Sequence, residues 1–273
     1  MDRNQIEAFM TRLIDEPGGN YVAEDAAILP DLVSLKLFER PNAGVAAHDD
    51  RYFTKCKEPG VVGPHYMLPS EWLPDARSVI SIFFGFTPRV LSSNAADRRE
   101  PSGEWLHARI EGQKFISWAM TALKDELERC GHRAVIPSSD PRFYAVGRPD
   151  EASRPGMSFT SVWSERHAAY ACGLGTFGLS KGLITKNGIA GRFGSVVTTL
   201  LLPPTPRDYT EVYEYCIMCG ECARQCPVGA ITIEGGKKHP ICGEYVDATK
   251  KKYAPRYGCG KCQVAVPCQS GRP

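Results

Sequence analysis

The chain has 273 residues, enough for about two domains, and its 42% hydrophobic and 23% charged residues are the composition of a folded globular protein. This composition excludes a disordered or fibrous chain. The formal net charge of +2 at pH 7 predicts neither a nucleic acid nor a membrane surface as a partner. No apolar run reaches the roughly 20 residues of a membrane helix, and the N-terminus shows no export pattern, so we expect a cytoplasmic protein without a membrane partner.

Hydrophobic spacing predicts the first elements of the chain. Apolar residues at helical intervals indicate a helix over residues 6–13, which the Pro-Gly-Gly of residues 17–19 would end. Residues 21–74 are rich in Pro, Gly and Asp and indicate only short strands and loops. The β-branched and aromatic run at residues 78–86 predicts a strand buried on both faces, at the centre of a sheet.

The next elements alternate between helix and strand. A polar loop is expected at residues 92–103, followed by a helix that includes residues 116–127. Residues 133–137 predict a short strand, residues 164–172 a second helix and residues 194–202 another buried strand. This order indicates a layered α/β or α+β fold.

Pro203 and Pro204 break the last of these strands and predict a domain boundary. Residues 1–205 would then form a first, α/β domain, and residues 206–273 a second domain that contains eight of the eleven cysteines. The three other cysteines are expected to be small buried hydrophobic residues: Cys56, Cys130 and Cys172.

The first cysteines of the second domain have a specific spacing. They form the pattern C-x2-C-x2-C-x3-C-P, which bacterial ferredoxins use to bind 4Fe-4S clusters, at Cys216, Cys219, Cys222, Cys226 and Pro227. In two-cluster proteins the fourth cysteine of such a run ligates the other cluster. A disulfide framework suits short exported chains better than this one, and structural zinc is the other alternative, because Cys-x2-Cys pairs also bind zinc.

Four further cysteines complete a second ligand set, and eight thiolates suffice for two clusters. We assign one cluster to Cys216, Cys219, Cys222 and Cys268, and the other to Cys226, Cys242, Cys259 and Cys262. Two adjacent clusters would pass single electrons. Basic residues nearby either dock an acidic electron donor or form a solvated face, and they are Lys237, Lys238, Lys250, Lys251, Lys252 and Arg256.

A glycine-rich stretch follows the second predicted helix. Gly173, Gly175 and Gly178 have the spacing G-x-G-x-x-G, but they follow a helix and not a strand, so they do not form a dinucleotide fingerprint. The glycines either let a flat cofactor approach the backbone or simply form a helix cap and a tight turn.

Several motifs together resemble the epoxyqueuosine reductases and their relatives the reductive dehalogenases. These motifs are the Leu73–Ile80 run, the Glu165-Arg166 pair, the glycine stretch, the Arg192–Thr198 run and the two cysteine sets. The resemblance spans about residues 73–268. It implies a nitroreductase-like core that binds a base-off cobalamin, followed by a ferredoxin-like domain with two 4Fe-4S clusters.

The resemblance also implies the site and the chemistry. The backbone that should line the corrinoid belongs to Gly173, Gly175, Thr176, Phe177 and Ser180. The activity would be a cobalamin-dependent reduction of a small-molecule or modified-nucleoside substrate, with electrons from a low-potential donor such as a ferredoxin or flavodoxin.

The chain departs from the family pattern at two positions. Phe159 stands about where epoxyqueuosine reductases have an acidic proton donor, so the sequence leaves the tRNA reaction open. Cys268 follows Cys262 by six residues, where the family usually has C-x3-C-P. The alternative function is a non-catalytic electron-transfer or corrinoid-handling iron–sulfur protein. A flavin enzyme on the same fold is a third hypothesis, and no flavin signature is readable.

Other polar residues carry weaker signals. Tyr170, Glu165 and Arg166 either supply protons and grip a substrate or, as is more common, form internal hydrogen bonds. His167 is expected to be structural. No metal-site spacing is present around His48, His65, His107, His132 or His239.

Overall fold

A four-stranded antiparallel sheet forms the centre of the computed structural model, which describes residues 1–16, 19–148 and 154–273. The strand order is β1 (Asn42–Ala47), β2 (Ser78–Gly85), β8 (Gly191–Thr198) and β3 (Ala134–Val135). The prediction of a buried central strand is confirmed, because β2 pairs on both sides and is buried along all but its last residue. The sheet places the chain in the α+β part of the predicted mixed class.

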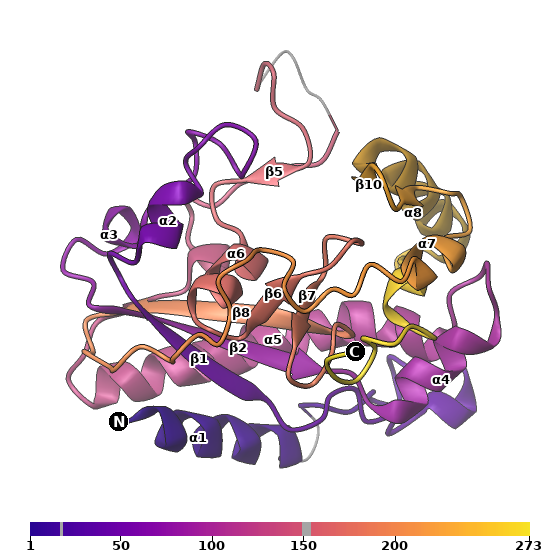
Figure 1. The fold of residues 1–273 in the computed structure, drawn as a ribbon. Coiled ribbons are helices and arrows are strands. Elements are labelled where there is room, and N and C mark those ends of the chain that lie inside the picture. The colour runs from indigo at the N-terminus through magenta and orange to yellow at the C-terminus, as the bar shows by residue number, and fades with distance from the viewer. Residues whose placement is uncertain (17–18, 149–153) are drawn as a thin grey trace.

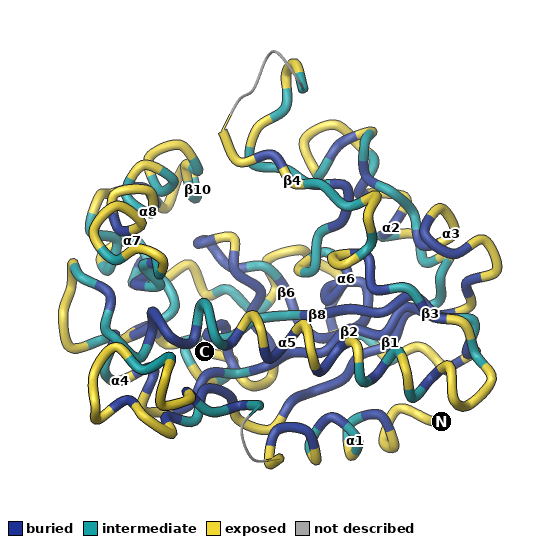
Figure 2. Tube along the Cα trace, turned by 180° about the vertical axis from the view of Figure 1, so that it is seen from behind, coloured by how far each residue is buried: buried dark blue, intermediate teal, exposed yellow. Residues whose placement is uncertain are grey.

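Helices cover both faces of this sheet (Figure 1). On one face, α1 (Arg3–Asp15) and the long α5 (Gly103–Arg129) share a core with Ile80 and Ile82 of β2. On the other face, α6 (Glu165–Ala171) packs in a second core with Val79. Figure 2 shows the sheet as the most deeply buried layer between them. Alternate residues of β2 therefore serve the two cores.

The remaining elements of the described residues lie around this sheet. They are α2 (Arg51–Lys55), α3 (Pro69–Trp72), α4 (Pro88–Ala96), α7 (Glu221–Arg224), α8 (His239–Tyr253), the hairpins β4 (Ala145–Val146) with β5 (Thr160–Ser161), β6 (Gly175–Phe177) with β7 (Leu183–Thr185), and β9 (Ile231–Thr232) with β10 (Gly236–Lys237), and the 3-10 turns η1 (Pro30–Leu32), η2 (Pro137–Ser139) and η3 (Lys261–Gln263). In Figure 1, α7, α8 and β10 stand opposite α2, α3 and β5.

The structure corrects some of the predicted elements. The polar loop predicted at residues 92–103 is wrong in its first half, because α4 runs to Ala96 from Pro88, a residue preorganised for the first turn of a helix. Helix α5 begins earlier than predicted, at Gly103, where the Ser102 hydroxyl accepts a hydrogen bond from the Trp105 N–H. Pro17 and Gly18, the predicted end of α1, lie outside the described residues.

Strand β3 is shorter than predicted and pairs only with Val197 and Thr198 of β8. Among the described residues, no other strand pairs along the outer edge of β8, so residues 191–196 of β8 have a strand neighbour only on the β2 side. This half-covered edge opens beside α5 and the start of α6. No helix in the described ranges has both the length and the apolar composition needed to cross a bilayer.

Candidate metal centre and adjoining cavities

Two similar turns present cysteines at the C-terminal end of the chain. Cys219 precedes Gly220, which has φ 76° and ψ 0° and caps α7, and Cys259 precedes Gly260, which has φ 70° and ψ 1° and caps η3. These angles lie in the left-handed region, which favours glycine. The helix α7 and the turn η3 pack against each other. The partial repeat of the cysteine pattern is therefore also a repeat of backbone shape.

The first cysteine set comprises Cys216, Cys219, Cys222 and Cys268, and three of its members share an apolar cluster. Cys216, Cys222 and Cys268 pack against Ile184, Ile189 and Val266. The carbonyl of Cys268 accepts a hydrogen bond of 2.8 Å from the Ile189 N–H, which fixes the C-terminal segment beside the β7–β8 turn. The Leu179 N–H donates to the Cys216 sulfur at 3.4 Å.

The second cysteine set comprises Cys226, Cys242, Cys259 and Cys262, and all four line one cavity of about 230 Å³. We call it the cysteine cavity. The Ala230 N–H donates to the Cys226 sulfur at 3.2 Å. The four cysteines come from three separate stretches, namely the end of the first run, helix α8 and the Gly260 turn.

The chemistry of both sets suits a group that neutralises thiolates. Burial, together with the nearby thiols of both sets, raises the pKa of Cys222 to about 12. Burial and the neighbouring thiols of Cys262 and Cys242 likewise raise the pKa of Cys259 to about 12. All eleven cysteines are free thiols, so the disulfide alternative is not what the fold shows.

No three His, Cys, Asp or Glu side chains in the described ranges are grouped as closely as one metal ion requires. A cubane cluster presents a different iron to each thiolate. The four thiols that line the cysteine cavity equal the ligand number of one such cluster, and the two ligand sets stay a prediction.

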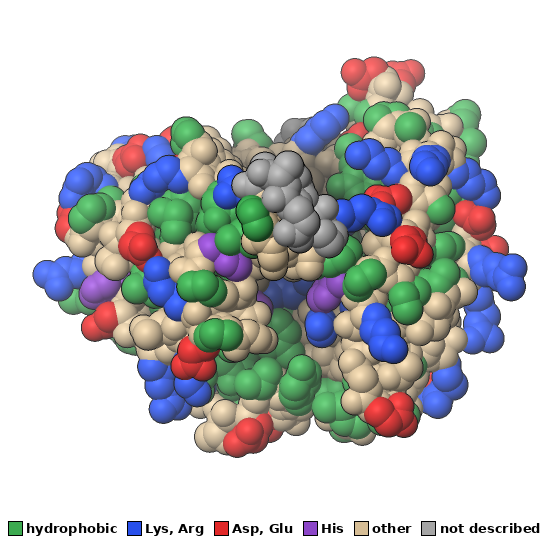
Figure 3. Space-filling view, turned by 90° about the horizontal axis from the view of Figure 1, so that it is seen from above, with side chains coloured by type: hydrophobic (Ala, Val, Ile, Leu, Met, Phe, Trp, Pro, Cys, Tyr) green, Lys and Arg blue, Asp and Glu red, His purple; other side chains and the backbone are tan. Residues whose placement is uncertain are grey.

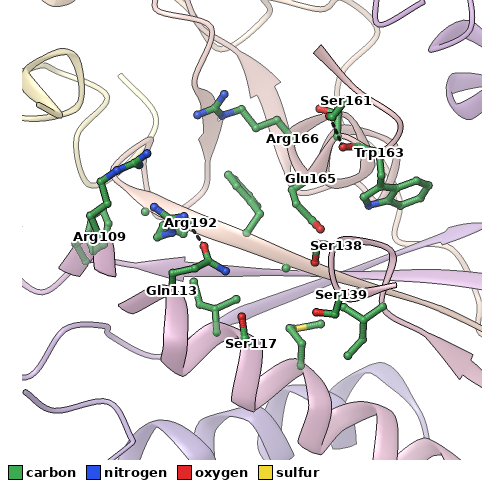
Figure 4. Close-up of a pocket in the computed structure, with 18 of the residues that line it drawn as sticks. Arg109, Gln113, Ser117, Ser138, Ser139, Ser161, Trp163, Glu165, Arg166 and Arg192 are labelled. Carbon is green, nitrogen blue, oxygen red and sulfur yellow. Dashed lines mark hydrogen bonds between the residues drawn. The ribbon is translucent and has the colours of Figure 1, made fainter. Parts of the chain in front are cut away.

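A second pocket, of about 360 Å³, lies at the open edge of β8, and we call it the edge pocket. Arg109 and Gln113 reach it from α5, Arg192 from β8, and Glu165 and Arg166 from the start of α6 (Figure 4). Figure 4 shows the guanidinium ends of the three arginines on one side of the pocket, whereas Glu165 points toward Ser138 on the other. The short β3 strand makes this arrangement possible.

Glu165 has an unusual environment. Both of its carboxylate oxygens are buried and have no hydrogen-bond partner of normal geometry. Burial raises the pKa of Glu165 to about 7, and the nearby hydroxyls of Ser195 and Ser138 limit the rise. Glu165 thus faces two hydroxyl groups inside the fold without a hydrogen bond of full geometry, and a carboxyl group with this pKa exchanges a proton near neutral pH.

A third cavity, of about 660 Å³, borders the predicted cofactor region, and we call it the wide cavity. Aromatic side chains of α2, α6 and β6 form its wall: Tyr52, Tyr170 and Phe177. Phe159 and His239 also line this cavity and stack on each other, with ring centroids 5.5 Å apart. Figure 3 shows a hollow in this upper face, with histidine and basic side chains around it.

One residue borders all three cavities. Arg166 lines the cysteine cavity, the wide cavity and the edge pocket. Burial lowers its pKa, and the thiol of Cys262 and the charge of Arg109 also act on it, in opposite directions. Arg166 is exposed, and among the described residues it forms neither an ion pair nor a hydrogen bond, so the internal hydrogen bond expected as the more common alternative is not present for it.

The residues predicted to line a corrinoid lie around the β6–β7 hairpin. Of the five, Phe177 lines the wide cavity. Gly173 and Gly175 have neighbouring chain segments where a Cβ would sit, and the nearest atom to a Cβ at Gly175 would be a carbonyl oxygen at 1.9 Å. Thr176 and Ser180 are buried. Close packing within the fold accounts for both glycines, and the set of corrinoid contacts stays a prediction.

Other predicted residues have mixed outcomes. The Tyr170 hydroxyl is buried without a hydrogen-bond partner of normal geometry, whereas His167 has the predicted structural contact, 2.7 Å from Nδ1 to the Ser164 hydroxyl, and also lines the wide cavity. Cys56 and Cys172 are buried as predicted, but Cys130 is exposed, because it caps the surface end of α5.

The basic residues near the cysteines are not equivalent. Arg256 pairs with Glu111 at 2.8 Å, and Lys252 pairs with Glu100 at 2.9 Å. Lys250 and Lys251 lie exposed in the last turn of α8, where cations are favourable. Within the described ranges, only some of these basic residues are therefore free of ion pairs and could contact an acidic electron donor.

Sequence reasoning missed several residues of the cavities. Arg109 and Gln113 carry no local signal, because they are ordinary polar positions of a long helix. His239 has no metal-ligand spacing, and its position in the sequence gives no sign of its stack on Phe159. Lys261 lies between two cysteines and is buried, with its ammonium group donating to Asn94 Oδ1 at 3.0 Å. The C-G-x-C repeat around this lysine was the one available signal.

Comparisons with known proteins agree with this geometry. Residues 209–232 match the 4Fe-4S binding domain model, which favours iron–sulfur over zinc for the first cysteine run. No curated protein sequence matches the chain.

Solved structures show the same fold. An epoxyqueuosine reductase with an epoxyqueuosine-modified tRNA-Tyr stem loop is 18% identical, with a TM-score of 0.51, over 85% of this chain and 62% of that one. A catabolic reductive dehalogenase is 13% identical, with a TM-score of 0.52, over 84% of this chain and 30% of that one. The chain thus spans less than two thirds of either protein. The predicted resemblance is confirmed for the fold, a mixed α and β structure with a 4Fe-4S binding region.

Proposed function

We propose that the chain is an iron–sulfur oxidoreductase that delivers single electrons through two 4Fe-4S clusters to a base-off cobalamin, for reductive chemistry on a small-molecule or modified-nucleoside substrate. The observation that carries the proposal is the meeting of three cavities at Arg166. One is lined by four cysteines, one is wide and aromatic, and one is polar and small. The 4Fe-4S domain match at residues 209–232 supports the cluster part of the proposal.

Different residues of the chain would bind the clusters and the corrinoid. The first cysteine set would hold one cluster and the second set the other, and the N–H groups of Leu179 and Ala230 already donate to sulfur. When bound, the clusters and the corrinoid supply single-electron transfer and a reducing cobalt centre. The aromatic wall of the wide cavity, with Tyr170 and Phe177, would exclude water from a flat ring system.

Proton supply needs a group other than residue 159. Phe159 stacks on His239 and cannot donate a proton. Glu165 lies six residues later, lines the edge pocket and has a pKa of about 7, which suits a group that holds a proton at neutral pH. We therefore assign the proton to the Glu165 carboxyl.

Phe159 also supports the second candidate function, an electron-transfer or corrinoid-handling protein without turnover. Such a protein needs the cysteine sets and the wide cavity but no proton donor beside the corrinoid. The two candidates differ in whether reduced, loaded protein consumes a substrate. A low-potential ferredoxin or flavodoxin would serve as the electron donor in both.

Metal analysis tests the proposal. The full chain is purified without oxygen from a host supplied with cobalamin, and iron, sulfide and cobalt are measured alongside visible spectra before and after reduction. We expect about eight irons and stoichiometric cobalt per chain. Phe177→Ala, in the wall of the wide cavity, should lower cobalt and leave iron unchanged, and Phe9→Ala on α1 is the matched control. Eight irons without cobalt, even after added corrinoid, would refute the cobalamin part.

A further inference from the structure

Three arginines of the edge pocket have no counter-charge. Among the described residues, Arg109, Arg166 and Arg192 form no ion pair, although seventeen ion pairs are present elsewhere. The neighbouring carboxylate of Glu111 is engaged by Arg256 at 2.8 Å. Guanidinium groups remain charged in proteins. The pocket therefore concentrates positive charge that the described side chains do not neutralise.

The arginines repel one another and are incompletely hydrogen-bonded. The charges of Arg109 and Arg166, added to burial, lower the pKa of Arg192 to about 9. The Nε atoms of Arg109 and Arg192 are buried without a partner. Arg109 lies over the Tyr257 ring, 4.3 Å from its centroid, and Arg192 donates to Gln113. Arg109 and Arg192 are half-buried and Arg166 is exposed, so an anion from solvent can reach the three side chains and pair with the N–H groups that the fold leaves without acceptors.

The second cysteine set does not account for all of this charge. Arg109 and Arg166 border the cysteine cavity as well, and the Cys262 thiol acts on Arg166. Arg192 and Gln113 line the edge pocket but not the cysteine cavity. The charges that act on Arg192 come from Arg109, Arg166 and Tyr257. Arg192 is thus placed for a ligand of the edge pocket.

The shape and lining of the pocket limit the ligand. A volume of about 360 Å³ is at the lower end for small-molecule sites. Hydroxyl groups line the side away from the arginines, at Ser138, Ser139 and Ser161, and aromatic rings complete the wall. Planar guanidinium groups bind carboxylate and phosphate oxygens through paired hydrogen bonds. The one carboxylate in the described lining is Glu165, which points toward Ser138 and away from the arginines.

We propose that Arg109, Arg166 and Arg192 form an oxyanion site in the edge pocket, which binds the carboxylate or phosphate group of a small organic molecule. This inference rests on the proposed function only for the view that the bound molecule is the substrate. A corrinoid with a nucleotide tail also carries a phosphodiester, so the same chemistry has two possible sources. Both sources require the three arginines.

Calorimetric titration of the anaerobic full chain tests the site, with inorganic phosphate and benzoate as probes. We expect at least one probe to bind, and Arg192→Gln to weaken that binding about tenfold or more through the loss of a charge-assisted hydrogen-bond pair. Arg192→Lys should give a smaller loss, because the charge remains but the planar fork does not. Arg3→Gln, an exposed position on α1, is the matched control and should bind as the parent does.

Two further measurements identify which molecule supplies the bound anion and provide a second variant. If prior loading with cobalamin abolishes phosphate binding, the site belongs to the cofactor's phosphodiester; if binding persists, it belongs to the substrate. Arg109→Gln is the second variant, should Arg192→Gln fail to fold. Unchanged affinity in a folded variant, or no binding of either probe by parent protein with its full iron content, would overturn the site. Iron and cobalt are measured on the same samples, so a failure of the proposed function is recognised separately.

Discussion

Replacement of Glu165 by glutamine should change the pH dependence of stability in a defined direction. Burial raises the pKa of Glu165 from 4.5 to about 7. At 1.36 kcal/mol per pKa unit, this rise corresponds to about 3 kcal/mol. Both carboxylate oxygens are buried, so solvent screens this contribution little. The folded state binds this proton more tightly than the unfolded state does, so its contribution to stability is complete below pH 4.5 and is lost as the pH rises toward 7.

Glutamine resembles the protonated carboxyl and does not titrate. The Glu165→Gln variant should therefore gain on the parent by about 2.5 kcal/mol between pH 5 and pH 8. The amide adds a constant offset, so the test is the growth of the difference with pH. Measured as the midpoint of thermal unfolding of anaerobic, cluster-loaded protein, the gain corresponds to roughly 5 °C or more. Glu24→Gln, at an exposed position, removes the same charge without burial.

The opposite slope would refute this reasoning. If Glu165 is ionised and held by the arginines of the edge pocket, its pKa would lie below 4.5 and the glutamine variant would lose stability as the pH rises. A difference that does not change with pH would show that the carboxyl titrates as in water. In either case Glu165 could not hold a proton at neutral pH, and its proposed role as the proton donor would be refuted.

Three further substitutions test the metal centre. Cys219→Ala should reduce iron from about eight to about four atoms per chain, and equal loss of both clusters, or of neither, would contradict the ligand assignment. Gly260→Ala should unfold the second cysteine turn, because a Cβ would lie 1.9 Å from the buried ring of Trp105. Gly229→Ala is the control, because Gly229 also has a positive φ but a Cβ there meets nothing within 4 Å. The thermal unfolding midpoint and the iron content should fall for Gly260→Ala and stay unchanged for the control. Lys261→Met should cost about 1–3 kcal/mol in urea unfolding, because the buried Asn94 carbonyl loses its donor while Asn94 Oδ1 keeps the Ser102 N–H, and an unchanged midpoint would contradict this.

Local patterns predicted the parts of the molecule that depend on nearby residues. The β-branched and aromatic run at residues 78–86 favours a buried strand, and β2 is a central strand of the sheet. The cysteine spacing likewise defines a turn whose geometry is set within a dozen residues, and the 4Fe-4S domain model matches it. The loop predicted at residues 92–103 failed because small polar residues, Ser92 to Asn94, mask the helix that Pro88 begins.

The cavities depend on contacts that no local pattern records. The edge pocket exists because β3 pairs with only two residues of β8, and a strand length of two is not readable from Ala134 and Val135. Arg109 enters the pocket because α5 begins at Gly103 and crosses β8. Cys130 was placed in the core by residue type alone, whereas its position at the end of α5 exposes it. Residue identity was informative there only once the helix boundary was known.

The position of Arg166 connects the oxyanion site with the second cysteine set. Its guanidinium interacts with the Cys262 thiol and with Arg109. Negative charge added at the second cysteine set and negative charge added in the edge pocket therefore interact with the same guanidinium. Binding of an anion and reduction of a cluster at that set should therefore oppose each other, and the two effects must be equal in free energy. If reduction weakens phosphate binding tenfold, saturating phosphate must lower the potential of a one-electron couple by about 59 mV. Potentiometric titration with and without phosphate measures the shift, and Arg166→Gln should abolish it. A potential that phosphate leaves unchanged, in protein that binds phosphate, would show that Arg166 does not couple the two sites.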